Sequence, residues 1–158
     1  MPDAWITTSS TNVEAIVNPL NAACNRGFVP DDVYILENPG VTDEVDQALA
    51  MIETIVEAYD EPAPEVHLTA LEADTAFERI HEYIREAIEE SQNKDSEVAV
   101  DITPGRKFMS AIAFATGMQY GADHVYYLYL DSSDHYGKLY PEMPRPAVQL
   151  YDFVEELR

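Results

Sequence analysis

Apolar residues in this chain form short runs that alternate with longer helical stripes. Short apolar runs flanked by turn residues indicate buried strands, whereas apolar positions spaced i, i+3, i+4 and i+7 indicate amphipathic helices. Five runs are predicted as strands: 4–8, 33–37, 66–71, 98–102 and 125–130. Helical stripes are predicted between or after them: 13–20, 45–59, 77–88 and 108–120. A last helix is expected to carry Leu150, Phe153, Val154 and Leu157 on one face.

Strands that alternate with helices predict a parallel sheet covered on both faces. We therefore expect an α/β fold: a doubly wound, mostly parallel sheet of about five to six strands in a Rossmann-like three-layer sandwich. The expected strand order is 3-2-1-4-5 or a close variant. Residues 1–158 are predicted to form one domain, with its core at about 4–130 and a loop plus a C-terminal helix at 131–158.

Ligands of such sheets bind beyond the carboxyl ends of the strands, where the strand order reverses. In the expected order, that point lies between the first and fourth strands. The turn after the first strand, Thr8 to Asn12, is therefore expected beside the turn after the fourth, Thr103 to Lys107. A long polar, proline-rich stretch from Asp131 to Pro146 has the length of a functional loop or lid.

The chain is strongly acidic, with 30 acidic against 9 basic residues and a formal net charge of −21. A binder of duplex nucleic acid needs a basic face, so this balance argues against that class. The charge is either an ordinary solvated surface or a sign of a halophilic, haloarchaeal source. Molar salt shortens the Debye length to about 3 Å and makes such self-repulsion tolerable.

Other classes of protein are disfavoured by what the sequence lacks. The single cysteine, Cys24, excludes an internal disulfide framework and a multi-thiolate zinc site. His81 and Glu82 begin an H-E-x-x-H pattern, but Arg85 stands at its fifth position, so no metal site is expected. No cofactor is expected either, since no G-x-G-x-x-G follows the first strand. Without an apolar run of about 18 residues or a secretory signal, we expect no membrane partner and a cytoplasmic location.

The turn after the fourth predicted strand is the most informative segment. Gly105 permits a positive φ or a close backbone approach, and the amides of residues 106–109 open a predicted helix. Arg106 and Lys107 put two cations at this helix N-terminus, where they oppose the helix dipole unless an anion is bound. The turn is thus a candidate anion site; alternatively, it is a surface turn whose bases pair with Asp101 or another acid.

Two other segments can contribute polar groups. Within Ser9–Asn12, we expect one residue to cap the following helix and another to face the ligand. In the 131–146 stretch, Tyr136 is placed to stack on a base and His135 to reach a ligand, although packing roles are the simpler interpretation for both. His67 and His124 are expected to be structural.

The segment Asp101–Ser110 resembles the signature of CARF domains (CRISPR-associated Rossmann fold). That signature is an apolar strand, then roughly D/N-x-T-x-G-x-K-x-M-S, then an apolar helix. The matching positions are Thr103, Gly105, Lys107, Met109 and Ser110. The Ser/Thr-rich turn Thr8–Thr11 is similar to a second feature of the family, and the resemblance covers about residues 4–130.

The resemblance implies a homodimer that binds a cyclic oligoadenylate, the second messenger of type III CRISPR systems. The resemblance also implies that Lys107 and the amides near Gly105 and Arg106 would bind phosphates. Ser9 or Ser10 would contact ribose or phosphate. The full set of expected ligand-binding residues is Thr8, Ser9, Ser10, Thr11, Asn12, Thr103, Pro104, Gly105, Arg106, Lys107, Ser110 and Tyr136.

Three functions are compatible with these residues. The first is a sensor that binds the messenger and signals through dimer closure or a separate effector protein. The second is a metal-independent ring nuclease, with Lys107, Ser9 and Ser10 as catalytic residues and His135 as the one candidate general base. The third is an unrelated mononucleotide-binding, flavodoxin-like protein with the same anion turn. CARF proteins usually carry an effector after this domain, whereas this sequence ends at Arg158 after one predicted helix, so it is a piece of a longer protein, a stand-alone sensor or a ring nuclease.

Overall fold

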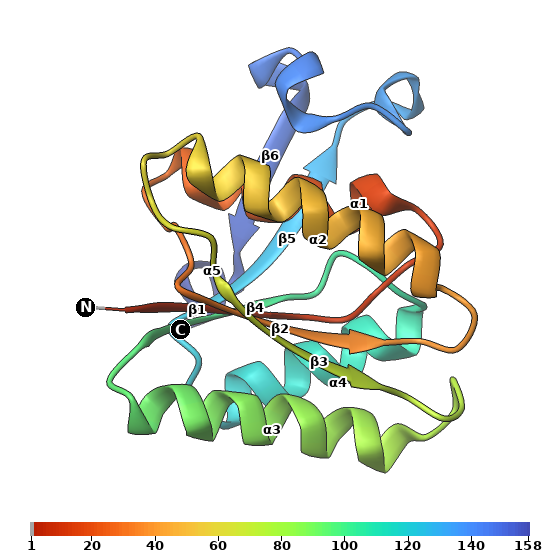
Figure 1. The fold of residues 1–158 in the computed structure, drawn as a ribbon, viewed down its shortest axis with the longest axis vertical. Helices are drawn as coiled ribbons and strands as arrows, with labels where there is room; N and C mark the ends of the chain where they lie inside the picture. Colours follow the sequence, from red (N-terminus) through yellow and green to blue (C-terminus); the bar gives the residue numbers. More distant parts are fainter. Residues whose placement is uncertain (1) are drawn as a thin grey trace.

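Six strands form one sheet in the order β3-β2-β1-β4-β5-β6 in the computed structural model, which describes residues 2–158 (Figure 1). The strands are β1 Asp3–Thr7, β2 Asp32–Glu37, β3 Glu65–Ala70, β4 Glu97–Asp101, β5 His124–Leu130 and β6 Val148–Asp152. The helices are α1 Val13–Asn25, α2 Thr42–Glu57, α3 Phe77–Asn93, α4 Lys107–Gln119 and α5 Phe153–Leu157. The predicted α/β class, strand order and three-layer arrangement are confirmed.

Helices cover both faces of the sheet, which explains why its central strands are apolar without alternation. Helices α1 and α2 lie on one face, and α3 and α4 lie on the other (Figure 1). Successive residues of β1 serve the two layers: Trp5 packs in the core under α1 and α2, and Ile6 in the core under α3 and α4. Both side chains have no exposed surface.

Strand β1 lies at the centre and pairs in parallel with both β2 and β4. Ile6 is in register with Tyr34 on one side and with Val100 on the other. The chain turns into α1 after β1 and into α4 after β4, toward opposite faces of the sheet. The carboxyl ends of β1 and β4 therefore form the point where the strand order reverses, as the sequence predicted.

Helix α4 lies close to the sheet at Gly117. A Cβ atom at Gly117 would lie 3.1 Å from Val125 Cγ2 and 3.4 Å from Val100 Cβ, so glycine permits the close approach. The helix carries no acidic residue, which is unusual in this chain. Among residues 2–158, no helix combines the length and the apolar character needed to cross a membrane.

The expectation of one helix that includes Leu150 was wrong, because Leu150 lies in a sixth strand. Strand β6 pairs antiparallel with β5, with Leu150 opposite Leu128. Leu150 and Asp152 point inward while Gln149 and Tyr151 are exposed, which is the period-2 alternation of a strand. Only Phe153–Leu157 are helical. Pairing with the free edge of β5 therefore made Val148–Asp152 a strand, although four apolar residues of this region have helical spacing.

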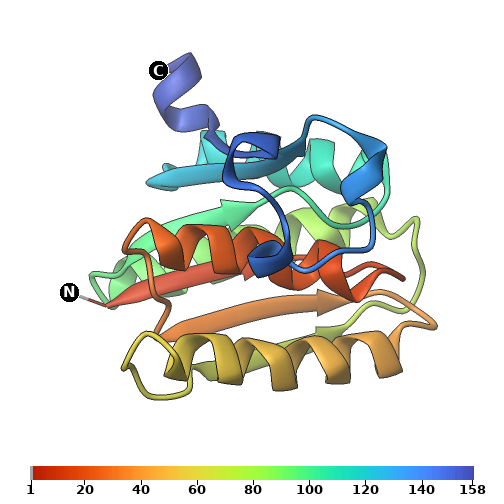
Figure 2. The ribbon, with the colours of Figure 1, turned by 90° about the horizontal axis from the view of Figure 1, so that it is seen from above.

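The 131–147 segment is ordered by short 3-10 turns rather than by a regular element. It packs on the first half of α1 (Figure 2). The Asn18 side chain fixes it, because Nδ2 donates to the Lys138 carbonyl at 2.8 Å and Oδ1 accepts from the Tyr140 amide at 2.9 Å. Tyr140 and Met143 are buried by this packing. The segment is thus a fixed wall beside α1.

His124 joins three strands through two carboxylates, in agreement with the structural role predicted for it. Its Nδ1 lies 2.7 Å from Asp152 Oδ2 in β6, and its Nε2 lies 2.8 Å from Glu97 Oε1 in β4. Burial by itself lowers the pKa of His124, but the hydrogen bonds and charges of Asp152 and Glu97 outweigh it and raise the pKa above the ordinary value. The imidazolium therefore stabilises the β4-β5-β6 half of the sheet.

We predict that His124→Gln lowers stability most at acidic pH. A histidine with a raised pKa contributes fully below its unfolded pKa of about 6.5 and loses that contribution as pH rises through the folded value. At pH 5 the loss should be about 1.5–3 kcal/mol, the range for hydrogen bonds to charged groups, and it should shrink at alkaline pH. Urea unfolding followed by the fluorescence of Trp5, the single tryptophan, measures it. His81→Gln, which loses a contact with the Thr116 hydroxyl instead, is the control; an equal loss at all pH values for His124→Gln would contradict the prediction.

Candidate functional site

The turns after β1 and β4 are joined by a direct hydrogen bond. The Thr8 hydroxyl donates to the Pro104 carbonyl at 3.2 Å, and both residues are buried. Gly105 follows with φ +92°, and a Cβ there would lie 3.1 Å from both Thr8 Oγ1 and Met109 Sδ. Glycine is therefore required both by the backbone conformation and by the contact between the two turns.

Asp101, the last residue of β4, anchors the second turn from inside the protein. Its fully buried carboxyl accepts a hydrogen bond from the Thr7 hydroxyl at 3.0 Å and another from the Thr103 amide at 2.9 Å. Burial raises the pKa of Asp101 to about 7, against these hydrogen bonds, which lower it. The Asp101 carboxyl thus stabilises the turn through these hydrogen bonds and does not pair with Arg106 or Lys107.

The two cations at the start of α4 have different surroundings. The Arg106 guanidinium lies 3.2 Å from Asp74 Oδ2, in the loop between β3 and α3. Lys107 is exposed, and within residues 2–158 no carboxylate lies within 4.0 Å of its ammonium. The alternative of a turn neutralised by acids therefore applies to Arg106 and not to Lys107.

Fewer backbone amides are free here than the sequence suggested. The Met109 amide donates to the Arg106 carbonyl at 2.9 Å, so it is already paired. Lys107 and Phe108 come first in the helix, and their amides have no acceptor in the described part of the chain. The amide of Arg106, just before the helix, has no acceptor within residues 2–158 either, so three N–H groups and one lysine form the available donor set at this terminus.

The turn after β1 is built differently from the expectation that one of its side chains caps α1. Asn12 occupies the N-cap position, but its side chain makes no capping hydrogen bond. Instead, Ser10 Oγ accepts from the Asn12 amide at 3.1 Å, a bond within the turn. Ser9 is fully buried, and its Oγ accepts from the Asn38 amide at 2.8 Å. The Ser9 and Ser10 hydroxyls therefore accept bonds from turn amides instead of capping α1, and the Asn12 side-chain carboxamide has no hydrogen-bond partner within residues 2–158.

A polar cleft of about 370 Å³ lies between the turns that follow β1, β2 and β4 and the loop that follows β3, and we call it the turn cleft. Its lining residues are Ser9, Ser10, Thr11, Asn12, Asn38, Pro39, Val41, Asp74, Gly105 and Arg106. Six of these were predicted as ligand-binding residues. Asn38, Pro39, Val41 and Asp74 were missed, although the Asn38-Pro39-Gly40 turn follows β2 and so had to lie at the same sheet edge.

The remaining predicted residues lie around this cleft rather than in it. Thr103 Oγ1 accepts from the Leu128 amide at 3.0 Å, and the Ser110 hydroxyl donates to the Ile102 carbonyl at 2.7 Å. These two hydroxyls hold the β4–α4 turn in place. Tyr136 lies in a second cleft of about 220 Å³, the loop cleft, between the start of α1, the end of β5 and the 131–147 segment.

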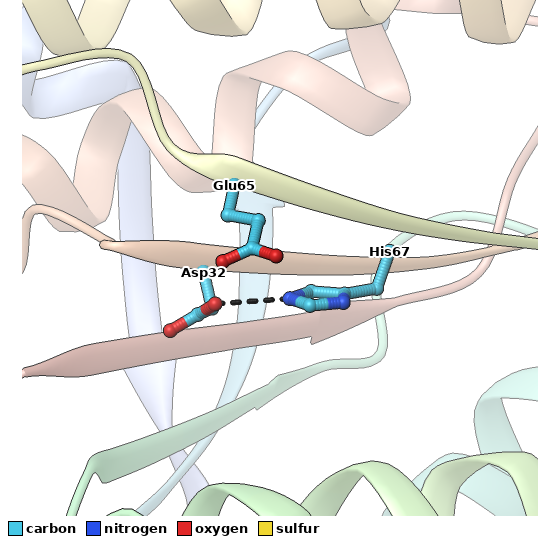
Figure 3. A group of neighbouring side chains, drawn as sticks. All are labelled: Asp32, Glu65 and His67. Carbon is cyan, nitrogen blue, oxygen red and sulfur yellow. Dashed lines mark hydrogen bonds and ion pairs between the residues drawn. The ribbon is translucent and has the colours of Figure 1, made fainter.

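A group of possible metal ligands lies at the opposite end of β2 and β3. The ligand atoms of Asp32, Glu65 and His67 lie within 4.8 Å of one another, and the side chains point toward a common centre (Figure 3). His67 Nε2 is 2.9 Å from Asp32 Oδ1, and the Lys94 ammonium is 3.8 Å from the same oxygen. The Lys94 ammonium would compete with a metal cation for the Asp32 carboxylate. The group lies at the beginning of β2 and β3, whereas the turn cleft lies beyond the ends of the strands.

A family model described as CRISPR-associated protein NE0113 matches residues 26–153. The chain belongs to this CRISPR-associated family. The expected membership of a CRISPR-associated family is confirmed by this match, which spans Asp101–Ser110. No curated protein matches the chain by sequence.

Solved structures share the fold of this CRISPR-associated protein. They include a type III CRISPR defence DNA nuclease activated by cyclic oligoadenylate (TM-score 0.63, 20% identity, 83% of this chain and 19% of that chain). Can2 from Sulfobacillus thermosulfidooxidans, in complex with cyclic tetra-adenylate, has a TM-score of 0.58 at 16% identity, over 84% of this chain and 33% of that chain. Enterococcus italicus Csm6, bound to cyclic hexa-2′-fluoro-hexa-dAMP, has a TM-score of 0.64 at 12% identity, over 96% of this chain and 42% of that chain. The chain thus spans between 19% and 42% of the length of these proteins.

We predict that Gly105→Ala destabilises the protein and separates the two turns. The added Cβ meets Thr8 and Met109 at 3.1 Å in a positive-φ conformation, which should cost about 1–3 kcal/mol. Gly27→Ala is the matched control, because Gly27 has φ +95° but nothing within 4 Å. The free energy of unfolding in urea, measured for both variants, separates the cost of the contact from the cost of the positive φ. An equal decrease in the two variants would show that the contact with Thr8 contributes nothing.

Proposed function

We propose that this protein binds a cyclic oligoadenylate at the joined turns after β1 and β4 and acts as a sensor in CRISPR defence. The observation that carries the proposal is the donor set at the start of α4. It consists of the exposed Lys107 ammonium and three backbone amides without an acceptor within residues 2–158, beside a polar cleft. Such a set stabilises phosphate oxygens by hydrogen bonding and by the helix dipole.

The net charge of the chain limits the ways in which it can bind a polyanion. A chain of net charge −21 repels a polyanion at long range unless salt screens it. Binding must therefore come from donors that touch the phosphates. The acid-free helix α4 provides a surface where those donors are not already neutralised.

The ligand and the protein both favour a homodimer. One chain contributes one β1 turn and one β4 turn, so it can hold only part of a ring of repeated nucleotides. A ring with two-fold symmetry matches two copies related by a two-fold axis, each presenting the same donors. A separate effector protein would then respond to closure of the dimer. The cytoplasmic location and the halophilic source stay predictions from the sequence.

Ring cleavage is the second candidate, favoured by the lysine without a partner and by Ser10, half-buried in the turn cleft. The ribose 2′ oxygen would attack the adjacent phosphorus and break its bond to the 5′ oxygen, which takes up the proton. The products would be a 2′,3′-cyclic phosphate and a 5′ hydroxyl. Lys107 would stabilise the phosphoryl charge, and Ser10 or the more buried Ser9 would orient the 2′ hydroxyl.

We predict that Lys107→Ala weakens binding of cyclic tetra-adenylate or cyclic hexa-adenylate by about 10- to 100-fold, the effect of one charged hydrogen bond. Isothermal titration in molar KCl with EDTA measures the dissociation constant. Lys94→Ala removes a lysine at the opposite sheet edge and should leave binding unchanged.

The same titrated samples distinguish the candidate functions by chromatography. Intact ring after incubation supports a sensor, and 2′,3′-cyclic phosphate products with EDTA present support a ring nuclease. Failure of the wild-type protein to bind either ring, or binding that Lys107→Ala leaves unchanged, would contradict the site. A flavodoxin-like mononucleotide binder would instead bind a mononucleotide and neither ring.

A further inference from the structure

We propose that the loop cleft is a subsite for one adenine base of the bound ring, stacked by Tyr136 and recognised by Asn12 and His135. This inference rests on the proposed function, because the phosphates at the turns would bring the base to the cleft. The base subsite would distinguish adenine from other bases, whereas the donors that bind phosphate cannot.

The loop cleft has the size and floor expected for a single ring system. Its volume of about 220 Å³ is below the roughly 300–1,000 Å³ of pockets that enclose drug-sized ligands. Leu128, Leu130 and Met143 supply apolar walls, and Thr103 of the β4 motif forms another part of the lining. A flat, largely apolar base fits such a cleft better than a ribose or a phosphate does.

Tyr136 is placed to cover a base in this cleft. Its side chain lines the cleft and is 69% exposed, the most exposed large hydrophobic residue of the described chain. The residue follows a 3-10 turn at Ser133–His135 and makes no aromatic pair within residues 2–158. An exposed aromatic ring at the rim of a cleft is what base stacking requires.

Two polar groups in the loop cleft remain available for the edge of the base. The Asn12 side chain makes no capping bond, and an asparagine amide can pair with both N6 and N7 of adenine. His135 lines the same cleft, and its buried Nδ1 has no hydrogen-bond partner within residues 2–158. By contrast, the Asn18 amide already bonds Lys138 and Tyr140, so it builds the wall.

The position of Asn12 links this subsite to the phosphate site. Asn12 lines both the turn cleft and the loop cleft, so the two are adjacent at this residue. Glu14 and Lys138 both line the loop cleft, and their opposite charges leave no excess of positive charge to attract a phosphate. A nucleotide held by its phosphate at the β4 turn can therefore place its base in the loop cleft.

The experiment compares cyclic tetra-adenylate with the same ring built from 7-deaza-adenosine, which lacks the N7 acceptor. Isothermal titration in molar KCl is carried out with the wild-type protein, Asn12→Ala, Tyr136→Ala, Tyr136→Phe and Tyr151→Ala. Cyclic hexa-adenylate and its 7-deaza form are the second pair of rings. Tyr151 is the matched control, since it is an exposed tyrosine of β6 that lines neither cleft.

We expect Tyr136→Ala to weaken binding of the adenine ring by about 5- to 150-fold, the range for loss of base stacking. Tyr136→Phe should keep the affinity within about twofold, and so should Tyr151→Ala. The wild-type protein should bind the 7-deaza ring more weakly, and Asn12→Ala should remove that difference, since the lost pair is the one that Asn12 makes.

Two results would overturn the subsite while leaving the proposed function in place. One is wild-type affinity of Tyr136→Ala for the adenine ring. The other is a 7-deaza penalty that is the same in Asn12→Ala as in the wild-type protein. If the wild-type protein binds no ring at all, the proposed function itself fails, so the two failures are distinguishable.

Discussion

The pairing of β1 with β4 at the centre of the sheet is the constraint on which the candidate site depends. It places residues more than ninety positions apart in register, as Ile6 and Val100 show. Beyond the strands, the Thr7 hydroxyl bonds the buried Asp101 carboxyl, and the Thr8 hydroxyl bonds the Pro104 carbonyl. These two hydrogen bonds join the turns into one surface. Gly105 completes it, because a Cβ atom there would lie 3.1 Å from the Thr8 hydroxyl oxygen of the other turn.

Electrostatics then determines what this surface can bind. The chain has a net charge of −21, and most of its acids face solvent, so long-range attraction of a polyanion is absent. The start of α4 differs, since Arg106 is paired with Asp74, while Lys107 and the first helix amides have no partner in the described part of the chain. Hydrogen-bond donors that act on contact still function when salt screens the field within about 3 Å. The site is therefore compatible with the acidic surface around it.

The separation of the loop cleft from the turn cleft arises from how the 131–147 segment packs. That segment has no long apolar stripe, and its position depends on the Asn18 side chain, which bonds both Lys138 and Tyr140. Asn18 is a buried polar residue inside α1, and its role is visible only with the segment in place. The sequence predicted that Tyr136 could stack on a base, but no sequence pattern indicated that Tyr136 lines a different cleft from Gly105 and Arg106.

The sequence by itself determined the α/β class, the strand order through β5, the point where that order reverses, and the β4 turn. These features depend on local patterns: apolar runs, helical spacing, and a Gly beside two bases at a strand end. Only the tertiary structure decided that Leu150 joins a strand, that Ser9 is buried against Asn38, and that Arg106 is paired while Lys107 is not. Each of these depends on a partner distant in sequence, and neither a hydrophobic pattern nor a motif specifies which distant group lies within hydrogen-bonding distance.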